Sequence, residues 1–109
     1  MARSKKNNVY FPLWNPQKST LRKIEVLNKK EAFIVFRNSC SAFIKKIDVR
    51  AYVLDKYLNE CVLCNSTKDL QIDHIISVYS HFNNDLFTEC NLESNLQVLC
   101  RKCNTSKLP

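Results

Sequence analysis

Two pairs of cysteines enclose an aspartate–histidine dipeptide in the second half of this chain. The pairs follow the pattern Cys-x-x-Cys: Cys61, Cys64, Cys100 and Cys103. Two cysteines separated by two residues can place both sulfur atoms on one ion, and two such pairs complete a tetrahedral Zn²⁺ shell. Because a shell of four thiolates has no open position, this zinc would stabilise the fold and could not activate water. Any chemistry must therefore come from the polar residues between and after the cysteines.

The six cysteines could instead belong to a secreted, disulfide-bonded protein. The segment 1–8 is basic and polar, with no apolar core after it, and no apolar run approaches the length of a membrane span. Cysteine pairs in a reducing compartment usually bind metal. We therefore predict a cytoplasmic protein with a four-cysteine zinc site, in which Cys40 and Cys90 are ordinary small apolar residues.

The motifs around the cysteines resemble those of a known family. Cys61-x-x-Cys64 is followed by Leu-Gln-Ile-Asp-His-Ile at 70–75 and by Asn-Leu-Gln-Val-Leu-Cys-Arg-Lys-Cys-Asn-Thr-Ser-Lys at 95–107. In this order the segments resemble the zinc-containing HNH endonucleases, which are nucleases of the ββα-metal type. The resemblance covers the second half of the chain and does not extend into residues 1–60.

The resemblance implies a role for each polar residue of the motif. It makes His74 the general base, and it makes Asp73 and Asn104 the ligands of a catalytic cation. Asn95 corresponds to the central asparagine, which holds the loop between the strands and orients the histidine; the alternative is a simple turn or cap asparagine. The family often has histidine at the last position, so Asn104 makes this an HNN variant. The family also usually has glycines after the first cysteine pair, whereas this chain has Asn65 there and no glycine at all.

The chemistry of phosphodiester hydrolysis supports these roles. A neutral imidazole, with an ordinary pKa near 6.5, can take a proton from water, so His74 suits the role of base. A general base contributes roughly 10²–10⁴-fold, far less than this reaction requires, so a Lewis acid must be added. Since the zinc shell is closed, a second cation is implied, and the oxygen atoms of Asp73 and Asn104 suit Mg²⁺ or Mn²⁺. Neighbouring strand residues point to opposite faces, so Asp73 and His74 can share one phosphate only near a strand end.

The expected elements give an α+β fold, with a helical N-terminal region followed by a zinc-stapled ββα-metal module. Apolar residues at three-to-four-residue spacing predict a helix capped by Ser19 or Thr20, a second over about 30–46, and a third capped by Asp48. The segment 31–37 could instead form a strand. After the first cysteine pair we expect a strand, a loop or turn, a second strand and a short helix, at residues 70–76, 80–94, 96–99 and 103–107.

Charge divides the chain at the same place. Residues 1–60 hold 13 Lys and Arg against 5 Asp and Glu, whereas residues 61–109 hold 4 against 5. We therefore divide the chain into a basic helical extension, 1–60, that grips nucleic acid and a zinc-bound nuclease module, 61–109. Arg101 and Lys107 follow the second cysteine pair and could contact flanking phosphates, or could be exposed surface charges.

Together these features predict a metal-dependent DNA endonuclease that nicks or cuts the duplex, with DNA as its partner and neither a membrane nor an organic cofactor. One alternative is a non-catalytic zinc module that binds DNA or RNA. Another is a structural zinc protein whose basic half binds a protein. The sequence carries no signal that distinguishes a monomer from a dimer.

Overall fold

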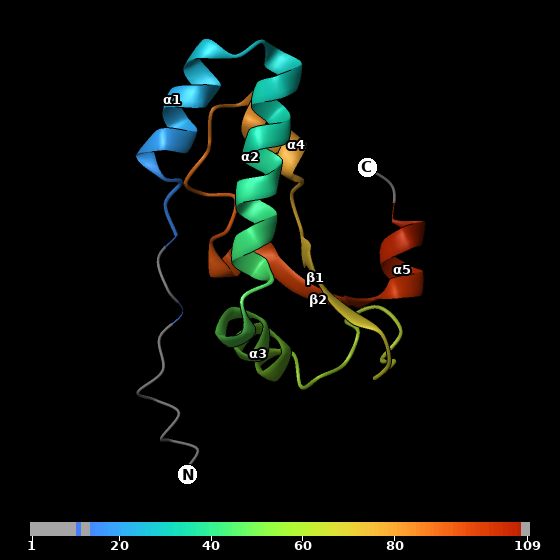
Figure 1. Cartoon of the computed structure of the whole chain (residues 1–109). Coiled ribbons are helices and arrows are strands. Elements are labelled where there is room, and N and C mark those ends of the chain that lie inside the picture. Colours follow the sequence, from blue (N-terminus) through green and yellow to red (C-terminus); the bar gives the residue numbers. More distant parts are fainter. Residues whose placement is uncertain (1–10, 12–13, 108–109) are drawn as a thin grey trace.

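We describe a computed structural model of the chain, covering residue 11 and residues 14–107. Within this part, a layer of helices lies against a two-stranded antiparallel hairpin (Figure 1). The elements in chain order are α1 (Lys18–Val26), α2 (Lys29–Ile44), α3 (Ile47–Lys56), β1 (Leu70–His74), α4 (Val78–Asn83), the 3-10 turn η2 (Glu93–Asn95), β2 (Leu96–Cys100) and α5 (Arg101–Ser106). The predicted α+β class is confirmed.

The central helix α2 is built on one apolar face. Its buried residues recur every three or four positions: Ala32, Phe36, Cys40 and Phe43. Asn28 caps its start, because the Asn28 side chain accepts a hydrogen bond from the Glu31 backbone N–H at 2.9 Å. This confirms the helix over 30–46 and rules out the alternative strand at 31–37.

The predicted N-caps of the other two long helices are wrong. Helix α1 begins at Lys18 after Gln17, so Ser19 and Thr20 lie inside it, and α3 begins at Ile47 after Lys46. Asp48 therefore lies in the first turn of α3, where a carboxylate still interacts favourably with the helix N-terminus. Neither Gln17 nor Lys46 makes a side-chain capping bond.

The hairpin has two faces with different neighbours. Leu70, Ile72 and His74 lie opposite Cys100, Val98 and Leu96 in the antiparallel register. On this face the strands pack against α3, where Val53 is buried with Leu96 and Val98. The other face carries Gln71 and Asp73 opposite Leu99 and Gln97. The predicted strands are confirmed, and β1 ends at His74 rather than at residue 76.

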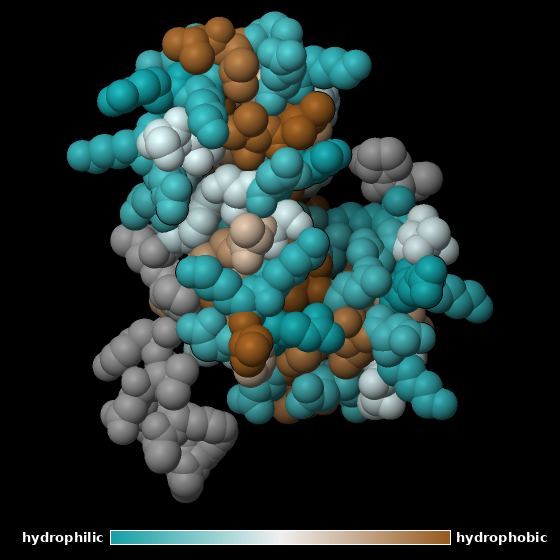
Figure 2. Space-filling model, in the orientation of Figure 1, coloured by the Kyte–Doolittle hydropathy of each residue, from teal (hydrophilic) through white to brown (hydrophobic). Residues whose placement is uncertain are grey.

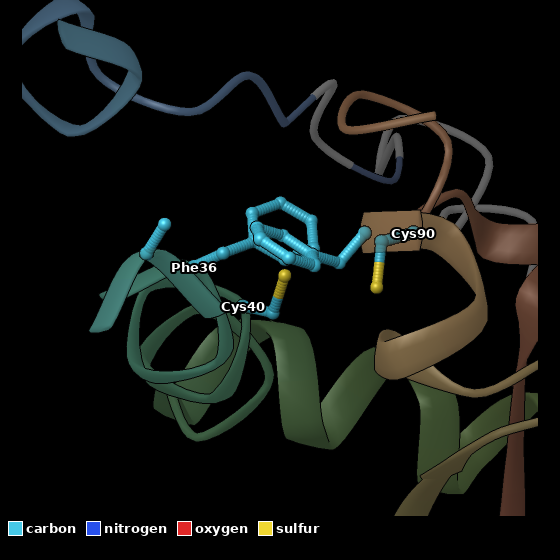
Figure 3. Close-up of a cluster of buried hydrophobic side chains, with 5 residues drawn as sticks. Phe36, Cys40 and Cys90 are labelled. Atoms are coloured by element: carbon cyan, nitrogen blue, oxygen red, sulfur yellow. The ribbon is translucent and has the colours of Figure 1, made fainter. Parts of the chain in front are cut away.

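The predicted loop at 80–94 is partly helical. Ser77 caps α4 by accepting a hydrogen bond from the Ser80 N–H at 3.0 Å. The helix was not predicted because the polar composition of this segment is typical of a loop. Phe82 of α4 then packs against Phe36 of α2, with ring centroids 6.0 Å apart. Figure 3 shows Phe36 with Cys40 and Cys90 in this buried cluster. The chain between the two strands is thereby fixed to α2.

The described helices include none with the length and apolar character that a membrane span requires. Cys40 and Cys90 are both fully buried, but the Cys90 thiol also hydrogen-bonds to Cys40 and His74, so the prediction of an ordinary apolar residue is wrong for Cys90. Asn65 has a φ of 65°, so it takes the left-handed conformation for which the family usually has glycine.

Candidate active site

The four paired cysteines converge on one point at the end of the hairpin. Their sulfur atoms all lie within 4.8 Å of one another, and Cys64 Sγ is 3.6 Å from Cys100 Sγ. A tetrahedral zinc with bonds of about 2.3 Å requires sulfur atoms about 3.8 Å apart. The four residues therefore fit a zinc ion, and they tie the loop before β1 to the end of β2 and to α5.

Backbone N–H groups donate hydrogen bonds to two of these sulfur atoms, and such bonds favour the thiolate form that binds a cation. Leu63 N–H donates to Cys61 Sγ and Cys103 N–H donates to Cys100 Sγ, both at 3.4 Å. Burial opposes ionisation of Cys61, yet hydrogen bonds from neighbouring N–H groups lower its pKa to about 6. The Cys100 thiol beside Cys103 raises the pKa of Cys103 to about 12. The four thiols therefore titrate as a linked group, and a cation that binds all four sulfur atoms would displace the remaining protons.

Three of the predicted catalytic residues, Asp73, His74 and Asn95, lie at the other end of the hairpin. His74 is the last residue of β1, so it and Asp73 lie at a strand end, as sharing one phosphate requires. Asp73 faces β2 and α5: its Oδ2 accepts hydrogen bonds from Gln97 Nε2 at 2.9 Å and from Lys107 Nζ at 2.6 Å. Lys107 Nζ also donates to the His74 carbonyl oxygen at 2.7 Å.

Asn104 lies on the same face of the hairpin. Its Nδ2 donates to Gln71 Oε1 at 2.6 Å, and Gln71 stands two residues before Asp73 on β1. This bond directs the amide nitrogen of Asn104 to Gln71 and leaves the amide oxygen to act as a ligand. One carboxylate and one amide oxygen form a hard donor set that suits Mg²⁺ or Mn²⁺. The ammonium of Lys107 at 2.6 Å from Asp73 indicates that a positive charge fits here.

The imidazole of His74 lies on the opposite face, toward α2. Its Nε2 is 2.6 Å from Asn91 Oδ1. Burial lowers the pKa of His74, but hydrogen bonds with Cys90 and Asn91 and the charge of Asp73 outweigh it, so the pKa is raised above 6.5. In turn the Cys40 thiol and the His74 ring lower the pKa of Cys90 to about 5, against the effect of burial.

Asn95 holds the turn that follows the histidine. Its Oδ1 accepts from Ile76 N–H at 2.8 Å, and its Nδ2 donates to the carbonyl oxygens of Ile76 at 3.1 Å and Cys90 at 2.9 Å. The backbone adds a bond from Ile75 N–H to the Asn95 carbonyl at 2.8 Å. The side chain is buried. The Asn95 side chain therefore links the turn after His74 to the segment that ends at Cys90.

Arg101 and Lys107 have different surroundings. Lys107 is engaged by Asp73, as described above, whereas Arg101 lines an open cleft with a volume of about 850 Å³. Arg50 of α3 and Gln71 of β1 line the same cleft. Arg50 donates to the Leu70 carbonyl oxygen at 2.9 Å, which holds its guanidinium beside the strand. A guanidinium from each half of the chain therefore faces this cleft.

Sequence reasoning missed Asn91, Gln71 and Gln97. Asn91 stands 17 positions after His74 in a segment expected to be a loop. The two glutamines alternate with apolar residues on the predicted strands, so they could have been assigned to the face of Asp73 by their period of two. Asn91 had no comparable local signal.

Comparison with known protein families agrees with this geometry. Residues 61–108 match the family model described as HNH endonuclease. The second part of the chain therefore carries an HNH domain, and its four cysteines are positioned to bind a metal, consistent with the zinc-containing form of the domain. Searches of the curated proteins and of the solved structures each gave no match.

Proposed function

We propose that the protein is a metal-dependent endonuclease that hydrolyses DNA phosphodiester bonds. The HNH domain match indicates a nuclease-type or DNA-binding function. The observation that carries the finer proposal is the set of polar side chains along β1: Asp73 and Asn104 offer oxygen ligands on one face, and His74 offers a base at the strand end. A domain that only bound DNA would need zinc and basic residues, but not this set.

In the proposed reaction, a nitrogen of His74 takes a proton from water while the water oxygen attacks phosphorus. The bond between phosphorus and the 3′ oxygen breaks, and the 3′ oxygen leaves and is protonated by solvent. The products are a 5′-phosphate and a 3′-hydroxyl. A divalent cation bound by Asp73 and Asn104 would supply Lewis-acid stabilisation of the charge on the phosphate and on the leaving oxygen. Asn95 keeps the turn after His74 in place through the bonds described above.

The basic helices would supply most of the affinity for DNA. Residues 1–60 carry 13 of the 17 Lys and Arg, and hydrophilic side chains cover most of the face seen in Figure 2. If about six phosphates are contacted, the logarithm of the affinity should fall with the logarithm of salt concentration at a slope of about −5. A slope near zero would contradict electrostatic binding by these helices.

A plasmid-nicking assay with Mg²⁺ or Mn²⁺ tests the proposal. The zinc-loaded protein should relax supercoiled DNA, and His74→Ala should lose this activity by about 10²–10⁴-fold. His81 is the other histidine of the chain, and His81→Ala is the comparison variant because its Nδ1 lies 3.0 Å from the Ser77 carbonyl oxygen, whereas Asn91 contacts the His74 ring. If the wild type and His74→Ala behave alike, the protein is a non-catalytic nucleic-acid-binding module.

A further inference from the structure

Asn91 connects the candidate base to the core of the N-terminal helices. Its Oδ1 lies 2.6 Å from His74 Nε2, and its Nδ2 donates to the Cys40 carbonyl oxygen at 3.2 Å. The side chain is only 1% exposed, so water does not compete for these bonds. We propose that Asn91 is a positioning residue that holds neutral His74 as the Nε2–H tautomer and leaves Nδ1 as the nitrogen that takes the proton from water. This inference rests on the proposed nuclease function.

The direction of the amide follows from its two partners. A backbone carbonyl can only accept a hydrogen bond, so the atom of Asn91 that faces Cys40 must be the NH₂ group. The oxygen of the amide therefore faces His74. Since an amide oxygen can only accept, Nε2 of His74 must carry the proton. In a neutral imidazole the other nitrogen, Nδ1, then has the lone pair.

The anchor of this arrangement lies in the first half of the chain. Cys40 is a fully buried residue of α2, and its carbonyl belongs to a helix that packs on α4 through Phe36 and Phe82. An amide held at both ends in a buried site has little freedom to rotate, so it fixes the ring plane as well as the tautomer. Cys90 and Asp73 are the other groups that interact with the imidazole.

The second histidine provides an internal control, because its neutral ring is expected to carry the proton on the other nitrogen. His81 Nδ1 lies 3.0 Å from the Ser77 carbonyl oxygen, which can only accept. His81 must therefore carry its proton on Nδ1. A long-range ¹H–¹⁵N correlation spectrum of the zinc-loaded protein, at a pH where both rings are neutral, reports both tautomers at once because the chain has two histidines. We expect Nε2–H for His74 and Nδ1–H for His81, and an Nδ1–H signature for His74 overturns the proposal.

Variants of Asn91 test the functional part. Asn91→Leu removes the acceptor, so His74 should become a mixture of tautomers and cleavage should fall about 10–100-fold, with the Mn²⁺ dissociation constant unchanged. Asn91→Asp keeps an acceptor oxygen and should retain the Nε2–H tautomer. Cys90→Ala removes a different neighbour of the ring and should also retain it. Zinc content and thermal melting identify any variant that fails to fold. If Asn91→Leu fails to fold, the His74 tautomers of the wild type and of Asn91→Asp test the proposal.

The outcomes separate the two proposals. If Asn91→Leu folds, shows mixed tautomers and still cleaves at the wild-type rate, the positioning role is refuted. If the wild type shows the expected tautomers but cleaves no DNA, the nuclease function fails while the assignment of the tautomer stands. A loss of cleavage with no change in the His74 tautomer of Asn91→Leu also contradicts the proposal.

Discussion

The ion pair between Lys107 and Asp73 predicts that removing one charge will strengthen metal binding. Lys107 Nζ is 2.6 Å from Asp73 Oδ2 and 2.7 Å from the His74 carbonyl oxygen, so the ammonium is bound to the carboxylate that is proposed to bind the catalytic cation. A divalent cation at Asp73 must displace this ammonium or be repelled by it. Lys107→Met keeps most of the aliphatic side chain and removes the competing charge.

The size of the effect follows from the strength of the ion pair. A hydrogen bond between charged groups contributes about 1.5–3 kcal/mol. The Lys107 side chain is 32% exposed and that of Asp73 is 11% exposed, so solvent screening reduces the contribution to about 1–2 kcal/mol. Because about 1.4 kcal/mol corresponds to a tenfold change, Lys107→Met should bind Mn²⁺ roughly 5–30-fold more tightly.

Calorimetry on zinc-loaded protein at low salt measures this affinity without any need for cleavage. Lys102→Met is the matched control, since it removes the same charge from an exposed position of α5, the helix that ends just before Lys107. Asp73→Asn should abolish Mn²⁺ binding in either background. Cleavage by Lys107→Met should not rise in proportion to metal affinity, because the variant lacks the ammonium that, once displaced by the metal, is expected to contact a flanking phosphate. An equal or weaker Mn²⁺ affinity in Lys107→Met than in Lys102→Met would refute the reasoning.

Three further predictions concern the zinc site, the turn after the histidine, and pH. Cys103→Ser should lose zinc and unfold the C-terminal part, whereas Asn104→Ala should keep zinc and lose cleavage; equal zinc loss in both, measured by metal analysis, would contradict two separate metal sites. Asn95→Ala leaves three backbone groups without their partners and should cost roughly 2–3 kcal/mol in urea denaturation, against less than about 0.5 kcal/mol for exposed Asn83→Ala. In the metal-free protein, the pKa of His74 measured by NMR should lie above 6.5. This raised pKa means that protonation stabilises the fold at low pH, and the contribution is lost as pH rises through the folded pKa.

The features of the site that depend on residues close together in the chain could be predicted from the sequence. Ligand spacing identified the four cysteines. The β-branched residues and polar flanks of 70–76 identified the first strand, and 96–99 was expected to pair with it. Asn65 was expected at a turn that usually has glycine, and it has a positive φ. These features depend on residues a few positions apart, where geometry is set by the backbone itself.

Contacts between distant segments were not predictable in the same way. Lys107 and Asp73 are 34 positions apart, and the bond from Asn91 to the Cys40 carbonyl spans 51 positions. Such pairs depend on how α4 packs on α2, and the polar segment 80–94 gave no periodic signal for that helix. The predicted caps at Ser19, Thr20 and Asp48 failed for a related reason, because tertiary packing outweighs a preference that contributes about 1 kcal/mol.

Because neighbouring residues of a strand point to opposite faces, different parts of the chain hold the two proposed catalytic residues. Asp73 is held from the side of β2 and α5, by Gln97 and Lys107. His74 faces α2 and is held through Asn91 by the Cys40 carbonyl. Residues 1–60 were predicted to grip nucleic acid, and the charge excess still supports that proposal. The hydrogen bonds give this region a second proposed role, since α2 would also orient the base. A substitution in α2 that displaces the Cys40 carbonyl could therefore impair cleavage without weakening the affinity for DNA or zinc, because it would affect His74 and not Asp73.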